Sequence, residues 1–241
     1  FLSISLMLAT TVAFAQANSS SVSQSGTSNG SNVLQDGSSN NSVVVQDGIV
    51  SLLSGEQNTA DVDQVGADNE SNVGQHGDFN DAIVNQLGDL NDATIDQGVG
   101  NAEGNDAKTT QTGNGNTSLQ TQRFDNNEAE VIQTGDGNNA LQNQSSGPDG
   151  SPGNYAIASQ LGDDNQSIQR QNGNSNEAYV YQVGTDHWAR QRQTGDSNEA
   201  RAIQGKSGNS SDQWQIGDNN FAIAYQNDSN NGGDNTSVQT Q

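Results

Sequence analysis

Small, apolar and amide-bearing residues recur at every second position in short segments, and each segment ends at a glycine. In the unit that begins at Asn29, these positions continue to Gln35, Gly37 follows, and the next unit begins at Asn40. A period of two is the pattern of a β-strand, and glycine tolerates the positive φ of a tight turn. Each 11-residue unit is therefore predicted to be one strand followed by one turn.

This repeat runs through almost the whole sequence and marks no domain boundary. Eighteen units and a final half unit follow one another from Asn18, with a degraded unit in Ile49–Gln57. Small insertions precede Asn105, Asn154 and Asn235. We therefore expect residues 16–241 to form a single repeat domain.

A longer period of 22 residues lies beneath the period of 11. From Asn116 onward, the position four residues after the first Asn alternates between Gln, as at Gln120, and Val or Ala, as at Val131. Two units would then close one coil, and successive coils would stack as parallel, in-register strands about 4.8 Å apart. The predicted fold is all-β, a parallel β-solenoid of about ten coils with two strands in each coil.

The composition agrees with a core that is built from amides. The 241 residues include 33 Asn and 28 Gln, and only 29% are apolar, against about 45–50% in ordinary globular domains. Stacked amides satisfy one another, each donating to the one below and accepting from the one above. The predicted ladders and small-residue stack are Asn154, Asn176, Asn198 and Asn220; Gln160, Gln182, Gln204 and Gln226; Gln171, Gln193 and Gln215; and Ala156, Ala178, Ala200 and Ala222. The predicted turn glycines are Gly162, Gly173, Gly184, Gly195 and Gly217.

Residues 1–15 have the pattern of a targeting segment. An apolar stretch ends in Ala13-Phe14-Ala15, a small-x-small motif that is typical of a signal cleavage site. We expect a remnant of a secretory signal here, an exported mature chain that starts near Gln16, and no membrane span in that mature chain.

Charge and residue types exclude several classes of function. The net charge is −22 and the chain has no Cys, which makes nucleic acid a poor partner and removes disulfides and thiolate metal sites. Turn acids such as Asp89, Asp136, Asp163 and Asp196 are interpreted as a solvated outer face rather than a calcium site. His76 and His187 are not paired by the repeat, so we expect no enzyme activity, metal or cofactor.

One predicted strand face carries apolar residues that point outward. These residues are Ile157, Tyr179, Tyr181, Ile203, Ile223 and Tyr225. Such a stripe serves contact between fibres, contact with other surfaces, or cross-strand packing alone, and the sequence leaves these choices open.

The repeat resembles a known family. The segment from Gln171 to Gln182 has the pattern Gln-x-Gly-x-x-Asn-x-Ala-x-x-x-Gln, and further copies run from Gln75 to Gln86 and from Gln193 to Gln204. This pattern is similar to the curlin repeat. The resemblance implies a bacterial cell-surface amyloid (curli) fibre subunit for biofilm matrix and adhesion. It also implies two partners besides the chain itself, a minor nucleator subunit and an outer-membrane secretion channel.

Two hypotheses about assembly follow. The repeat reaches both ends of the sequence, so both ends are predicted to offer unpaired strand edges and unfinished ladders for head-to-tail growth. The alternative is a monomeric extracellular β-solenoid that acts as an adhesin or binding module. The sequence does not distinguish the major fibre subunit from a nucleator, and it gives neither the handedness of the solenoid nor the polarity of a fibre.

Overall fold

The computed structural model describes residues 17–47, 56–147, 150–227 and 235–241. The predicted signal remnant and most of the degraded unit lie outside the described residues. The first described strands are β1 (Ser19–Gln24), β2 (Gly30–Ser38), β3 (Asn41–Asp47), β4 (Thr59–Ala67), β5 (Glu70–Asp78), β6 (Asp81–Leu87), β7 (Asp92–Glu103), β8 (Asp106–Thr112), β9 (Thr117–Arg123) and β10 (Glu128–Thr134). The chain continues through β11 (Asn139–Ser145), β12 (Tyr155–Leu161), β13 (Gln166–Asn172), β14 (Glu177–Thr185), β15 (Trp188–Thr194), β16 (Glu199–Ser207), β17 (Ser210–Ile216), β18 (Phe221–Asn227) and β19 (Thr236–Thr240).

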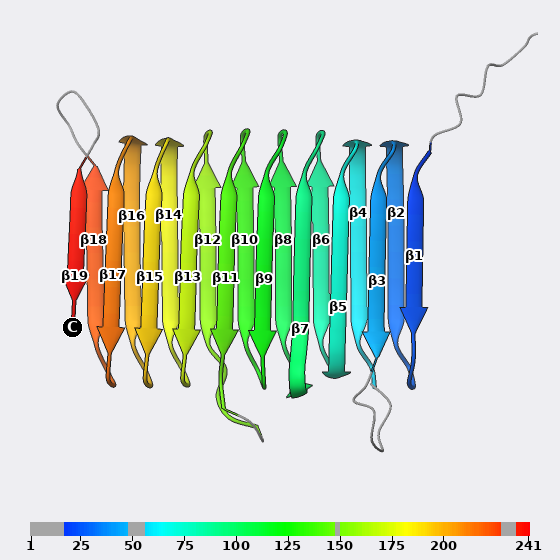
Figure 1. Ribbon diagram of the computed structural model, residues 1–241, viewed down its shortest axis with the longest axis horizontal. Helices are drawn as coiled ribbons and strands as arrows, with labels where there is room; N and C mark the ends of the chain where they lie inside the picture. Colours follow the sequence, from blue (N-terminus) through cyan, green and yellow to red (C-terminus); the bar gives the residue numbers. More distant parts are fainter. Residues whose placement is uncertain (1–16, 48–55, 148–149, 228–234) are drawn as a thin grey trace, which may run out of the picture.

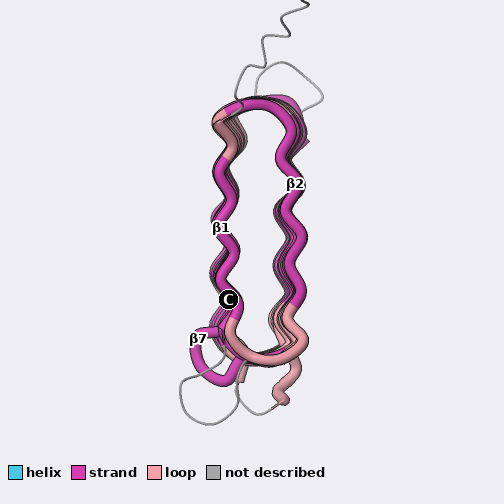
Figure 2. Tube along the Cα trace, turned by 90° about the vertical axis from the view of Figure 1, so that its right-hand side faces the viewer, coloured by secondary structure: helices cyan, strands magenta, loops and turns pink. Residues whose placement is uncertain are grey.

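These strands form two parallel sheets that face each other. The odd-numbered strands make a ten-stranded sheet and the even-numbered strands a nine-stranded sheet, each in chain order. The chain crosses from one sheet to the other at every turn, so β1 and β19 lie at opposite ends of the stack (Figure 1). Seen along the stack, each coil is a flattened loop with one strand on each side (Figure 2). The predicted two-strand parallel β-solenoid is confirmed, with about nine coils in the described chain.

The strand register follows the repeat, and the insertions are absorbed either between strands or, before Asn105, by a register shift within β7. Tyr155 pairs with Glu177 and Glu177 with Glu199, each a step of 22 residues. Where the sequence has extra residues the step is longer, as between Ala129 and Ala156. Parallel pairing at equivalent positions therefore continues across the insertion, because the added residues lie outside the ladders.

The degraded unit adds no rung to the stack. Strand β2 pairs directly with β4, with Gly30 opposite Thr59, so no strand lies between them. Glu56 lies outside the named strands, in an isolated bridge to Thr27, and its backbone also bonds Asp78 and Phe79. The unit is therefore an insertion between β3 and β4, and its residues 49–55 lie outside the described part of the chain.

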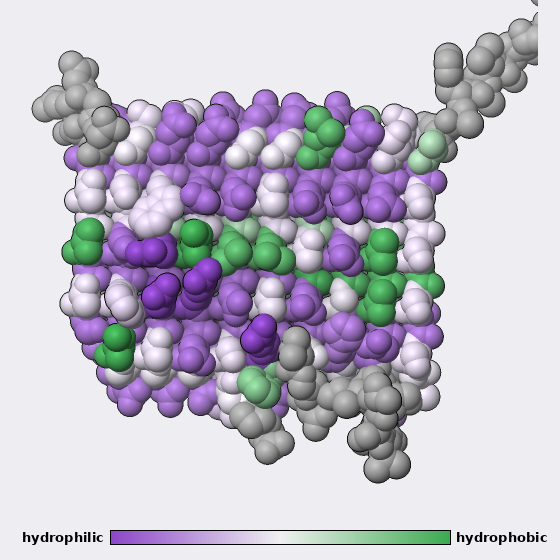
Figure 3. Space-filling model, in the orientation of Figure 1, coloured by the Kyte–Doolittle hydropathy of each residue, from purple (hydrophilic) through white to green (hydrophobic). Residues whose placement is uncertain are grey.

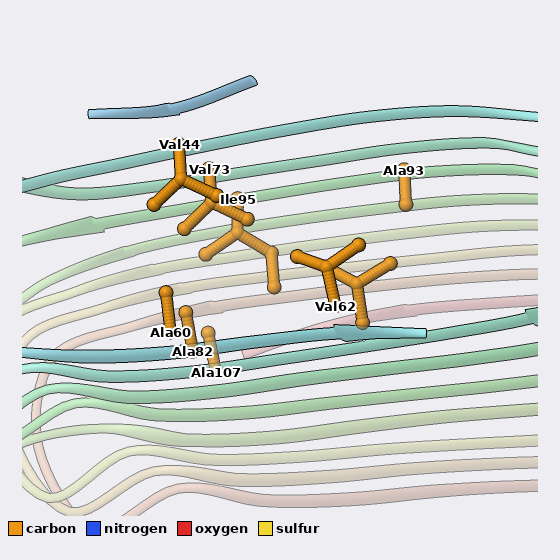
Figure 4. Close-up of a cluster of buried hydrophobic side chains, with 9 residues drawn as sticks. Val44, Ala60, Val62, Val73, Ala82, Ala93, Ile95 and Ala107 are labelled. Carbon is orange, nitrogen blue, oxygen red and sulfur yellow. The ribbon is translucent and has the colours of Figure 1, made fainter. Parts of the chain in front are cut away.

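Two kinds of core fill the space between the sheets. In the N-terminal half, buried aliphatic residues meet across the interior, including Val44, Val62, Val73 and Ile95 (Figure 4). In the C-terminal half, the matching inward positions of the odd strands carry buried Gln, as at Gln169, and Ala or Val faces them. From Asn116 onward, the pair of aliphatic residues across the interior is therefore replaced by a long Gln opposite a smaller residue. This replacement explains why the alternation in the sequence begins there.

Candidate functional site

A Gln ladder runs through the interior of the nine-stranded sheet. Gln160 donates to Gln182 and Gln182 to Gln204 through Nε2–Oε1 hydrogen bonds of 2.9 Å, and Gln204 donates to Gln226 at 2.9 Å. Gln182 Nε2 also donates to the carbonyl oxygen of Gln166 on the facing sheet at 2.9 Å. The ladder therefore joins successive coils and also ties the two sheets together.

The facing sheet carries the matching ladder. Gln171 donates to Gln193 and Gln193 to Gln215 at 3.0 Å, and Gln215 reaches Gln241 at 3.3 Å. Gln171 Nε2 donates across the interior to the carbonyl oxygen of Tyr155 at 2.9 Å. These cross-sheet bonds satisfy buried amides that would otherwise cost about 1–3 kcal/mol each.

A third Gln ladder occupies the same sheet in the C-terminal half. Gln120, Gln142, Gln169, Gln191 and Gln213 each donate to the next rung, at 2.9–3.1 Å, and Gln213 donates to Gln239 at 2.8 Å. The alternation along the sequence marks these positions, although the sequence pattern alone does not place them in a ladder. The signal was their spacing of about 22 residues.

An Asn ladder lies at the corner where each even strand begins. Asn176 Nδ2 donates to Asn154 Oδ1 at 3.0 Å, and Asn198 repeats this with Asn176. Asn220 makes the same bond to Asn198 at 2.9 Å. Each Asn oxygen also accepts the backbone N–H of the Asn above it, as Asn154 Oδ1 does from Asn176 at 3.1 Å. The corner amides thus hold backbone groups that the strand ladders leave free at the turn.

The two kinds of amide ladder run in opposite directions. Asn side chains donate to the rung that comes earlier in the chain, as Asn176 does to Asn154. Gln side chains donate to the later rung, as Gln182 does to Gln204. The second acceptor also differs: the Gln amide bonds a backbone carbonyl of the opposite sheet, whereas the Asn amide bonds a turn carbonyl, as Asn176 does that of Gly195.

Small residues let the sheets approach between these amides. Ala156, Ala178 and Ala200 are completely buried, and Ala222 is 3% exposed. They are Cα partners along β12, β14, β16 and β18. A larger side chain in this row would push against the facing sheet, since interiors are close-packed.

The turn glycines combine positive φ with very close backbone neighbours. Gly162, Gly173, Gly184, Gly195 and Gly217 have φ values between 101° and 128°. A Cβ on Gly173 would lie 2.1 Å from the carbonyl oxygen of Gly195, and one on Gly184 would lie 1.6 Å from that of Lys206. Four of these positions therefore admit only glycine for both conformational and steric reasons. Gly217, near the end of the stack, has no atom closer than 3.7 Å to such a Cβ.

The acidic residues of the turns have a structural role that sequence reasoning missed. Asp196 Oδ1 accepts the backbone N–H of Asn174 at 2.8 Å, and Asp163 Oδ1 accepts that of Asp136 at 2.9 Å. Asp89 does the same for Ala67 at 2.8 Å. These side chains lie outside the core, as expected, yet each caps the turn of the preceding coil. Their recurrence directly after the glycine was the available signal.

A second row of corner residues, Asn165, His187 and Asn209, lies where the odd strands β13, β15 and β17 begin. His187 takes the place of an Asn there and keeps the hydrogen bonds to the backbone of the row. Its backbone N–H donates to Asn165 Oδ1 at 3.1 Å, and its Nδ1 lies 3.2 Å from the backbone N–H of Asn209, which it accepts. Nε2 then donates to the carbonyl oxygen of Val183 at 3.2 Å. Burial lowers the pKa of His187, and the backbone contacts oppose this effect. The neutral imidazole therefore fits the corner as a hydrogen-bonding substitute for Asn. His76 instead pairs with Asp47 near the surface.

The remaining predicted features lie on the outside. Tyr181, Ile223 and Tyr225 of the apolar stripe are exposed, on the outer face of the nine-stranded sheet. Within the described ranges, no three or more His, Asp or Glu side chains come together as a possible metal site. The same part of the chain contains no helix that could span a membrane.

Comparison with known families identifies the repeat. The family model for the curlin associated repeat matches residues 66–98, from the end of β4 to β7. No curated protein matches the chain. The matched segment contains two full units of the repeat that continues through the whole stack.

Proposed function

We propose that this curlin-repeat protein is a secreted structural subunit that stacks head to tail into an extracellular, curli-like amyloid fibre. The observation that carries the proposal is the set of continuous amide ladders, which reach the outermost described rungs. Gln24 on β1 and Gln241 after β19 each belong to a ladder with one bonded neighbour along the stack. A second copy would continue the same bonds.

The backbone supports the same conclusion. Strands β1 and β2 lie at one edge of the two sheets and β18 and β19 at the other, and no further described strand covers them. Unpaired parallel edges recruit other strands unless they are blocked. Since the two straight sides of the coils superpose along the stack (Figure 2), one copy can be placed on another without a change of shape in the strands.

The biological setting is inferred from the family. Curlin-repeat subunits form fibres at the bacterial surface, and we extend to this chain a role in biofilm matrix and adhesion. By the same inference, a minor nucleator subunit and an outer-membrane channel are its partners, and the exported fibre lies outside the cell.

Growth of fibres from the purified full chain tests this proposal. After dilution from denaturant we expect a rise in Thioflavin T fluorescence with a lag that preformed fragments remove, and fibres in electron micrographs. A monodisperse monomer that persists at micromolar concentration would overturn the proposal and favour a monomeric binding module.

A matched pair of variants tests the junction itself. Gln241→Glu replaces the amide donor at the last described rung of its ladder by a carboxylate, which would face a Gln side-chain oxygen on the first coil of the next copy. Thr240→Glu adds the same charge at the neighbouring outward position. We expect Gln241→Glu to slow elongation about tenfold, since a hydrogen-bond donor is lost and the carboxylate faces an amide oxygen that cannot donate to it. Equal rates for the two variants would contradict growth through this ladder.

A further inference from the structure

The outer face of the ten-stranded sheet gathers the arginines and tryptophans of the chain. The protein has five Arg and two Trp in a chain of net charge −22. Four of the Arg and both Trp lie on β9, β13, β15 and β17 of this sheet. Figure 3 shows this face, where the most hydrophilic side chains gather over β13 and β15. A positive patch on so acidic a protein is not explained by solubility.

Three of these guanidinium groups line one shallow groove. Arg123, Arg170 and Arg192, together with Asn143, Ser145 and Thr194, form a surface depression of about 410 Å³. Among the described residues, none of the three arginines forms an ion pair with an acidic side chain. By contrast, Arg190 pairs with Asp212 on the same face, and Arg201 pairs with Glu199 on the other sheet. The groove therefore holds guanidinium donors that the described chain does not neutralise.

A tryptophan on the neighbouring coil positions the guanidinium group of Arg192. The guanidinium carbon of Arg192 lies 5.1 Å from the ring centroid of Trp214, a cation–π contact. Arg170 and Arg192 are Cα partners on adjacent strands β13 and β15. The two positive groups therefore stand one rung apart, and Arg192 is positioned before any ligand arrives.

The spacing of the positive groups indicates the shape of the ligand. The groove crosses four strands from β9 to β15, a length of about 14 Å at one rung per 4.8 Å. Three cations over this distance match a linear polymer with about one negative group per rung. Duplex DNA carries one charge per about 1.7 Å of axis, far more than three arginines neutralise, and the acidic remainder of the protein would repel the excess.

The chemistry of the lining indicates the class of that polymer. Guanidinium groups bind carboxylates through two parallel hydrogen bonds. The other lining groups are the amides and hydroxyls of Asn143, Ser145, Gln171, Asn172, Gln193 and Thr194, which suit sugar hydroxyls. We propose that this groove binds a linear polysaccharide that carries carboxylates on its sugar rings.

A binding measurement on the freshly refolded full chain tests the proposal. The probe is polygalacturonate, and its methyl ester is the uncharged control polymer. We expect the wild type to bind polygalacturonate and not the ester, with weaker binding as salt rises. Arg170→Gln/Arg192→Gln should weaken binding about tenfold or more, since two charge-assisted pairs are lost. Arg201→Gln removes one positive charge from the other face and should change little; it is the charge-matched control for a single groove substitution such as Arg123→Gln.

The outcomes separate the alternatives. Equal binding of the ester, equal binding by the double variant, or tighter binding of duplex DNA through the same arginines would each overturn the proposal. Far-UV circular dichroism checks that the variants fold. If the double variant does not fold, Arg123→Gln at the exposed end of β9 replaces it and should weaken binding at least threefold. The measurement uses unassembled chain, so its result does not depend on fibre formation.

Discussion

At the scale of single residues, the protein depends on glycines, which have no side chain, and on Asn and Gln, whose side chains end in an amide. The turn glycines allow carbonyl oxygens of neighbouring coils within about 2 Å of where a Cβ would stand, as at Gly173. Buried Gln and Asn supply the bonds between coils. The sequence predicted both sets by their spacing, because a residue that must stack on its equivalent has to recur with the period of the coil.

The glycine requirement can be measured at two positions that differ in their neighbours. Gly173→Ala and Gly217→Ala both introduce a Cβ at positive φ, 122° and 101°, which costs about 1–2 kcal/mol. Only the first also overlaps a backbone oxygen, that of Gly195. We expect Gly173→Ala to lower the free energy of unfolding by about 3 kcal/mol or more in urea titrations of the unassembled chain. Similar losses for the two variants would contradict a steric origin.

Some residue roles were beyond sequence reasoning for a physical reason. The second hydrogen bond of each Gln amide goes to a backbone carbonyl across the interior, as Gln182 reaches Gln166. The distance from the amide to that carbonyl is set by the gap between the two sheets and not by the order of residues. The acceptance of a turn N–H by Asp196 likewise depends on how the next coil is placed.

At the scale of the strands, each rung is stabilised by both of its neighbours. Gln182 on β14 accepts from Gln160 and donates to Gln204 and to the facing backbone. An end rung such as Gln226 on β18 accepts from Gln204 and has no Gln above it among the described residues. The contribution of a ladder residue to the free energy of unfolding therefore falls toward the end of the stack, as expected for repeat proteins.

Substitution along one ladder tests this dependence. Gln182→Leu keeps a similar volume but leaves Gln160 without an acceptor and Gln204 without a donor, so we expect a loss of about 2–4 kcal/mol. Gln226→Leu disturbs one Gln neighbour and should cost about half as much. Urea unfolding of both variants provides the comparison. An equal loss at the two positions would show that the ladders do not couple the coils.

At the scale of the whole molecule, like charges are stacked one above another. Asp81, Asp106 and Glu128 are Cα partners on successive strands of the nine-stranded sheet. Partial burial raises the pKa of Asp106, and the nearby Asp81 and Glu130 raise it further, against the effect of Lys108. The pKa of Glu128 is raised for similar reasons. In-register stacking thus places a repulsion on the outside of a fold that its interior stabilises.

The raised pKa values, which come from partial burial first and from repulsion second, predict how stability depends on pH. Carboxyl groups whose pKa is raised by folding bind more protons in the folded state, so stability increases as pH falls through their folded pKa toward the unfolded values near 4. His187 acts in the opposite direction below about pH 6.5, because burial lowers its pKa. Asp106→Asn leaves His187 unchanged, so the difference between the two chains isolates the acidic row. We expect the variant to be more stable than the wild type at pH 7 and nearly equal at pH 4 in urea unfolding. A constant difference across this range would contradict the explanation.

The overall architecture was predictable because a repeat of 11 within 22 residues permits few alternatives. The insertion between β3 and β4 was harder, since Ile49–Gln57 retains traces of the repeat but contributes no rung. The arginine groove was also missed. Arg123, Arg170 and Arg192 lie far apart in the sequence, and the stacking of four coils brings them to one surface.

Because each ladder has a fixed donor-to-acceptor direction, the two ends of the solenoid are chemically different. Toward β1 the outermost Gln presents its oxygen and the outermost Asn its N–H group, whereas toward β19 the assignment is reversed. Two copies that point the same way therefore meet donor to acceptor in both ladders. Two copies that point in opposite ways would meet oxygen to oxygen and N–H to N–H. A fibre of this protein would thus be polar along its whole length, with chemically different tips that elongate at different rates.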